Sequence, residues 1–140
     1  MSERPTLARL LLERERWLDA AARAELARRG KPKLSRSHAL VFANVEPGGT
    51  RISEIARRAG VSRQAIHQSV SELAEIGLVE LAADPTNRSA RLVRLTASGR
   101  KVDRTAWAVF DELERRLAER IGDREVDRLR KVLSQDWGPP

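Results

Sequence analysis

The chain of 140 residues contains no cysteine. This absence excludes disulfides, thiolate zinc sites and redox sensing through cysteine. Aromatic residues are also scarce, at 4%, so leucine, valine, isoleucine and alanine must build most of the core of a sequence that is 41% hydrophobic. A chain of this length and composition fits one domain with a modest core.

The sequence also lacks any apolar run near the roughly 18 residues that a membrane-spanning helix needs. Its first residues, Met1 to Arg4, lead into a charged amphipathic segment and not into the apolar stretch of a signal peptide. We therefore expect a cytoplasmic protein that does not contact a membrane.

Histidine occurs only at His38 and His67. Two separated imidazoles without cysteine make a poor metal site, so no metal or other cofactor is expected. Neither histidine has an acidic or nucleophilic partner at motif spacing, and the chain has no glycine-rich phosphate loop. These absences argue against an enzyme, and no catalytic residue is predicted.

Residues 51–78 have the pattern of two short helices joined by a tight turn. Ala56 supplies a small side chain where the helices cross, Gly60 tolerates positive φ in the turn, and Ile66 is an apolar anchor for the second helix. An ordinary helical hairpin would share this pattern. The segment that follows favours a helix-turn-helix, and with it DNA.

That segment is predicted to be a β-hairpin, with strands over residues 78–83 and 90–96 and a polar turn over residues 84–89. Pro85 and Asn87 supply the turn chemistry. A basic hairpin directly after a helix-turn-helix is a wing.

The chain resembles the MarR family of winged-helix transcription regulators at these positions. The residues that carry the resemblance are Leu73, Gly77-Leu78-Val79, Asp84-Pro85, Leu95-Thr96 and Gly99-Arg100. The resemblance implies a mainly α fold with a small β-hairpin wing (α+β). It places a winged helix-turn-helix DNA-binding part at residues 34–100 of a single domain, with dimerisation helices at residues 1–33 and 101–140.

Hydrophobic periodicity predicts the flanking helices. They are expected over residues 7–29, 35–45 and 96–121, and over a last segment from Asp123 to Trp137, with a minimal strand at residues 50–52. Hydroxyl side chains that can cap helix starts are Ser35, Ser53, Ser62 and Thr96.

The winged unit can close its own small core. The predicted core residues are Ile55, Ala56, Val61, Ile66, Val70, Leu73, Val79, Val93 and Leu95. The terminal helices are then left with apolar stripes that a second copy of the chain would bury most simply. A two-fold homodimer follows, presenting two recognition helices to a pseudo-palindromic site in double-stranded DNA.

The distribution of charge along the chain also favours DNA as the partner. The formal net charge of +7 is divided as +4 over residues 1–50, +3 over residues 51–100 and zero over residues 101–140. A solvated arginine-rich surface would give a basic chain by itself, but its coincidence with a helix-turn-helix favours nucleic acid.

The second helix of the motif has a polar face that can read DNA. Arg63, Gln64 and Gln68 are predicted to contact base edges, because arginine can read guanine and glutamine can read adenine. Ser62 and Ser71 are predicted to contact phosphate, and His67 is a further candidate. A merely solvated polar face is the alternative.

The wing departs from the resembled family. Asn87 and Ser89 replace the aspartate that braces the turn and the arginine at the tip, so Arg88 and Arg91 are the available substitutes for minor-groove contact. A wing that touches only the DNA backbone is the alternative. Further phosphate contacts are predicted for Arg51, Arg57 and Arg58. The alternative is that these side chains are simply solvated.

Regulators of the resembled kind often bind a small aromatic, anionic effector beside the dimerisation helices. Residues that could line such a cleft here are Arg14, Trp17, His38, Phe42 and Trp107. Aromatic residues at helical spacing are also ordinary core residues, which is the alternative.

Two functions remain open. One is a sequence-specific homodimeric regulator, and a repressor is favoured because occlusion of DNA needs no activation surface. The other is a winged-helix module that binds a protein partner and has only weak, non-specific DNA affinity, for which the altered wing is the main support.

Overall fold

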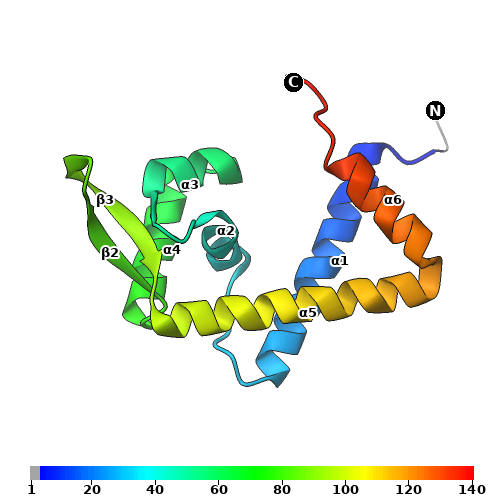
Figure 1. Ribbon diagram of the computed structural model, residues 1–140, viewed down its shortest axis with the longest axis horizontal. Helices are drawn as coiled ribbons and strands as arrows, with labels where there is room; N and C mark the ends of the chain where they lie inside the picture. Colours follow the sequence, from blue (N-terminus) through cyan, green and yellow to red (C-terminus); the bar gives the residue numbers. More distant parts are fainter. Residues whose placement is uncertain (1–3) are drawn as a thin grey trace. The chain divides into compact units, whose positions relative to one another are not determined.

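The computed structural model describes residues 4–140, which form helices and one small sheet (Figure 1). In chain order the elements are α1 (Leu7–Arg28), α2 (Arg36–Asn44), β1 (Thr50–Arg51), α3 (Ile52–Ala59), α4 (Arg63–Glu75), β2 (Val79–Asp84), β3 (Asn87–Leu95), α5 (Ala97–Ile121) and α6 (Asp123–Leu133). They group into two compact units. The first unit is Leu26–Ala106, and the second comprises the described residues up to Glu25 together with Trp107–Pro140.

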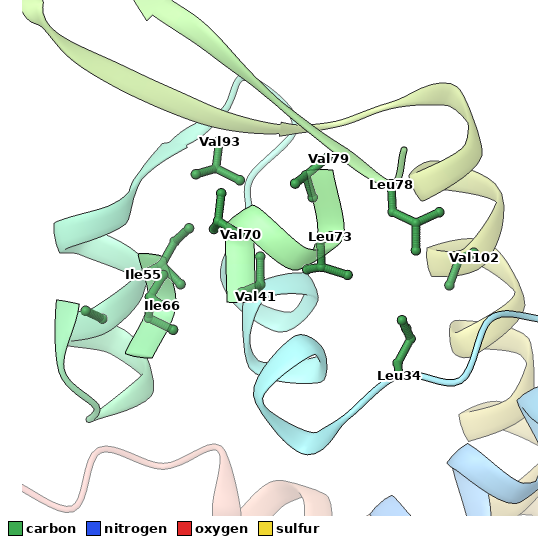
Figure 2. Packing of buried hydrophobic residues seen from close by; sticks show 11 residues of the cluster. Leu34, Val41, Ile55, Ile66, Val70, Leu73, Leu78, Val79, Val93 and Val102 are labelled. Carbon is green, nitrogen blue, oxygen red and sulfur yellow. The ribbon is translucent and has the colours of Figure 1, made fainter. Parts of the chain in front are cut away.

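The core of the Leu26–Ala106 unit lies among α2, α3, α4 and the sheet. Figure 2 shows its buried aliphatic side chains, which come from all of these elements. The largest fully buried members are Val41, Ile55, Ile66, Val70, Leu73 and Val93. Most of the predicted core is confirmed, but Val61 is 37% exposed because it lies in the turn between α3 and α4. The sequence interpretation missed Leu34, Val41, Leu78 and Val102.

The sheet is antiparallel and has the strand order β1-β3-β2. Thr50 of β1 pairs with Val93, and Val79 of β2 pairs with Leu95. The wing strands run closer to the tip than predicted, since β2 ends at Asp84 and β3 begins at Asn87. Only Pro85 and Thr86 remain between the strands, because Asp84 accepts a hydrogen bond from the Thr86 backbone and closes the turn.

The helix-turn-helix begins differently from the prediction. Ser53 is not a cap: α3 already begins at Ile52 because β1 runs directly into it, and its N-cap residue Arg51 makes no capping side-chain hydrogen bond. The cap at Ser62 is confirmed, with its Oγ accepting from the Ala65 backbone N–H at 3.1 Å. Gly60 ends α3 at φ +67°, which glycine adopts without strain.

The start of α5 is fixed against the end of α4. Thr96 Oγ1 accepts from the Gly99 backbone N–H at 3.0 Å and donates to the Gly77 carbonyl at 2.6 Å, which confirms the predicted cap. A Cβ at Gly99 would clash with the carbonyl oxygen of Leu78. The wing and α4 are therefore held in a defined arrangement.

The second unit has few buried residues and many exposed apolar ones. Ala22, Val109 and Leu113 are buried, whereas α6 buries no residue. Exposed apolar side chains in this unit are Leu7, Leu12, Trp17, Trp107, Phe110, Ile121, Leu129, Val132, Leu133 and Trp137. The last helix ends at Leu133 and does not reach Trp137 as predicted, because the chain turns there and the Trp137 indole N–H donates to the Val132 carbonyl. No helix within residues 4–140 is long and apolar enough to cross a membrane.

Candidate nucleic-acid interface

Helix α4 presents one polar face to solvent. Ile66, Val70 and Leu73 are buried at steps of three and four residues, which is the period of one helix face. The residues predicted to contact DNA from this helix are all exposed, and they are Ser62, Arg63, Gln64, His67, Gln68 and Ser71. Ser62 accepts from a backbone N–H, so its own O–H remains available to donate to a phosphate oxygen.

A groove runs beside this face. It is lined from α4 and its cap by Ser62, Gln64, Ala65, Gln68, Ser69 and Glu72, and from the start of α2 by Ser35 and Ser37. The sequence interpretation missed this contribution of α2. The capping sequence at Ser35 was visible, but nothing in the sequence placed the start of α2 next to α4.

Glu72 links the two helices across this groove. One carboxylate oxygen accepts from Gln68 Nε2 at 3.1 Å, and the other lies 2.6 Å from His38 Nε2. The hydrogen bonds from Gln68 and His38 hold the pKa of the Glu72 carboxyl below its ordinary value. Glu72 is therefore a charged neighbour of a predicted base-reading residue, and it was not predicted from the sequence.

The predicted effector residues are divided between the two units. His38 is engaged by Glu72, and Phe42 packs against the core of the Leu26–Ala106 unit. Arg14, Trp17 and Trp107 belong to the other unit, where their side chains are exposed. A ligand cleft built from these residues stays a prediction.

The two arginines of α3 are paired with carboxylates within the protein. Arg57 and Arg58 both bind Glu54, and Arg58 also binds Glu46 at 2.9 Å. Hydrogen bonds from Arg57 and Arg58 lower the pKa of Glu54 to about 2. These ion pairs reduce the positive charge that the two arginines offer to phosphate, and their role in DNA contact stays a prediction.

Arg51 has a structural role in addition to its predicted one. Its guanidinium binds Asp84 Oδ2 through Nε at 2.7 Å, while Asp84 Oδ1 accepts from the Thr86 backbone and hydroxyl. The Asp84 side chain is only 5% exposed. It therefore joins β1 to the turn of the wing.

The wing tip keeps a brace at the position where the resembled family usually has aspartate. Asn87 Oδ1 accepts from the Ser89 backbone at 3.1 Å and from the Ser89 hydroxyl at 2.7 Å. This Asx turn performs the bracing that an aspartate would perform. Within the part of the chain that the structure describes, no ion pair engages the exposed side chains of Arg63, Arg88 and Arg91.

We expect Asp84 to make the wing sensitive to acid. Hydrogen bonds from Thr86 and the Arg51 guanidinium lower the pKa of Asp84 from 3.8 to about 2. A lowered pKa stabilises the folded state above the unfolded pKa, and this contribution is lost as the pH falls toward about 2.

Chemical unfolding of the wild type and Asp84→Asn, measured from pH 7 to pH 2, tests this expectation. The free energies of unfolding should differ by a constant amount above about pH 5, and the difference should shrink as the pH falls from there toward about 2. Asp111→Asn, at an exposed position in α5, is the matched control and should run parallel to the wild type. A constant difference over the whole range would contradict a charge effect at Asp84.

The second helix of the helix-turn-helix has an exposed polar face, and the hairpin β2-β3 that follows it pairs with β1 in a three-stranded sheet. This arrangement defines a winged helix-turn-helix protein. A model of the MarR family matches residues 33–88, and the chain resembles this family of winged helix-turn-helix transcription regulators. This is a family of DNA-binding regulators and not of enzymes.

The chain is also similar to other proteins in sequence and to solved structures in fold. An uncharacterized protein of Mycobacterium tuberculosis is 30% identical over 82 residues, which are 59% of this chain and 57% of that protein. The chain thus spans little more than half the length of this relative. The HTH-type transcriptional regulator TcaR of Staphylococcus aureus is 28% identical over 102 residues, covering 71% of this chain and 66% of TcaR.

Among solved structures, CouR from Rhodococcus jostii RHA1 bound to p-coumaroyl-CoA has a TM-score of 0.75 at 26% identity, over 94% of this chain and 93% of CouR. Apo MarR from E. coli has a TM-score of 0.77 at 20% identity, over 94% of this chain and 96% of MarR. The second likeness shows the shared fold alone.

Proposed function

We propose that this protein is a sequence-specific DNA-binding transcription regulator that acts as a homodimer. The observation that carries the proposal is the exposed polar face of α4, where Gln64 is exposed and Arg63 makes no ion pair within residues 4–140. Arginine and glutamine are the side chains that read guanine and adenine in the major groove. The free arginines of the wing add contacts to the neighbouring backbone or minor groove.

The exposed apolar residues of the second unit support the homodimer. Such a set is unusual on the surface of a monomer and is typical of a surface that another chain covers. A two-fold dimer would present two α4 helices to half-sites about one duplex turn apart, roughly 34 Å. Binding there would occlude the DNA, so we propose a repressor.

We also propose that a small aromatic or anionic effector relieves this binding. The support is that CouR, which shares the fold, was solved bound to p-coumaroyl-CoA. In this chain Trp17 and Trp107 offer exposed aromatic surface, and Arg14 offers an exposed cation. Titrating aromatic carboxylates and acyl thioesters into the protein–DNA complex, with release of DNA as the readout, tests the proposal.

Replacing Arg63 or Gln64 with alanine should relax base preference. A bidentate contact to a base contributes about 1 to 3 kcal/mol of discrimination, so each variant should lose preference at symmetric positions of both half-sites. Selection from a random pool of duplex DNA, followed by sequencing, measures the loss. The control is Gln135→Ala, an exposed glutamine beyond α6. Uniformly weaker binding with unchanged preference would assign both residues to phosphate contact.

The pairing of Arg51, Arg57 and Arg58 with carboxylates favours one alternative, a winged-helix module that binds a protein partner. Such a module would have little free positive charge for DNA. It would form the same dimer but bind all duplexes weakly, and the random pool would yield no enriched sequence.

A further inference from the structure

The amide of Gln68 is held in one orientation on the surface of α4. Its Nε2 donates to Glu72 Oε1 at 3.1 Å, one helical turn along α4. Glutamine alone would rotate freely at this exposed position and would have to be ordered when DNA binds. The contact with Glu72 removes part of that freedom beforehand.

Glu72 is itself held by a second helix. His38 of α2 places Nε2 2.6 Å from Glu72 Oε2, and the His38 side chain is only 12% exposed. The other ring nitrogen, His38 Nδ1, accepts from the Ser35 backbone N–H at 3.1 Å. Because Nδ1 accepts, a neutral ring carries its proton on Nε2, which makes His38 a donor to Glu72.

Both oxygens of the Glu72 carboxylate therefore accept hydrogen bonds, and the capping box of α2 fixes the imidazole that holds one of them. Binding sites and metal sites commonly contain residues that do not touch the ligand but orient a side chain that does. The chain of contacts runs from the start of α2 to a predicted base-reading residue.

The orientation that results suits adenine. With one N–H on Glu72, the amide of Gln68 keeps one N–H and its carbonyl oxygen free. Adenine presents an acceptor at N7 and a donor at N6, whereas guanine presents two acceptors. A carboxylate beside the amide also disfavours the acceptor-rich edge of guanine, because like partial charges then face each other.

We propose that Glu72, held by His38, is a positioning residue that orients Gln68 to read adenine in preference to guanine. This inference rests on the proposed DNA-reading function of α4. It adds a specificity-determining contact from α2, an element outside the helix-turn-helix.

The test uses the full chain and selection from a random duplex pool. Gln68→Ala first identifies the position that Gln68 reads. Glu72→Gln keeps the size of the side chain but leaves only one acceptor oxygen for the two donors, Gln68 and His38. The preference for adenine at that position should therefore fall by at least about threefold. This is a part of the roughly fivefold or greater preference that a bidentate contact contributes. The adenine preference of the double variant, Gln68→Ala with Glu72→Gln, should be no lower than that of Gln68→Ala alone, since the two residues act through one contact.

Two variants separate positioning from other effects. His38→Glu keeps a residue that suits the capping box, but its carboxylate has no hydrogen to donate to Glu72, so it should reduce preference at the same position. Glu75→Gln removes the same charge from the same helix, at an exposed carboxylate that makes no hydrogen bond or ion pair within residues 4–140, and it should leave base preference unchanged.

Each failure has a distinct meaning. If Gln68→Ala changes one position but Glu72→Gln only lowers the melting temperature, Glu72 is structural and the inference is wrong, while the regulator stands. If Gln68→Ala changes no position of an otherwise selective protein, Gln68 reads no base and the inference is again wrong. If the wild type selects no sequence, the proposed function itself fails.

Discussion

Replacing Leu129 and Leu133 with glutamate should convert the protein to a monomer and weaken operator binding by at least about a hundredfold. Both leucines lie on α6, both are 46% exposed, and α6 buries no residue within the chain. Charged side chains there would disrupt an apolar dimer surface while leaving the fold of each unit intact. Loss of the dimer removes the second half-site contact, and linked sites of this kind add about 10² to 10⁴ in affinity.

Sedimentation at micromolar concentration and DNA titration measure the two effects. Arg128→Ala with Lys131→Ala is the matched control, because it changes the net charge of α6 by the same amount and spares the leucines. The control should remain a dimer. A variant with both glutamates that still sediments as a dimer would place the interface elsewhere.

The second large effect is expected from the wing. Arg88 and Arg91 are exposed and engaged by no ion pair among the described residues, so a dimer offers about four such contacts to DNA. Each phosphate contact contributes about 0.9 to the slope of log affinity against log salt. Changing both residues to alanine should therefore reduce the slope by about 3 to 4.

Binding titrations between low and moderate salt measure this slope. Arg124→Ala with Arg128→Ala removes the same charge from α6 and should leave the slope nearly unchanged. In the opposite direction, Ser89→Arg should tighten binding most on sites with A·T-rich flanks, whose minor groove is narrow. An unaltered slope in the wing variant would mean that the wing stays off the DNA, and it would favour the protein-partner alternative.

Local sequence signals predicted most of the helices and the wing. The helix starts with a hydroxyl cap, at Ser35, Ser62 and Thr96, were correct because capping depends on neighbouring residues only. The prediction that Ser53 caps α3 was wrong, because β1 pairs with β3 and this long-range interaction shifts the start of α3 to Ile52. The prediction that Val61 belongs to the core was wrong, because hydrophobicity alone does not distinguish a turn residue from a core residue.

The candidate site was predictable only in part for the same reason. The exposed face of α4 follows from helical period, so its polar residues could be identified in advance. The contacts of His38 with Glu72 and of Arg51 with Asp84 join residues 34 and 33 positions apart. Pairings at such separations depend on how the elements pack, and no local pattern in the sequence encodes them.

The most direct test of the central claim is to sequence the duplexes that the purified full-length protein retains from a random pool. A homodimer that reads bases through α4 should enrich a pseudo-palindrome whose half-sites lie about 10 base pairs apart. Recovery of the pool without an enriched sequence, at salt concentrations where the protein still binds DNA, would contradict sequence-specific regulation.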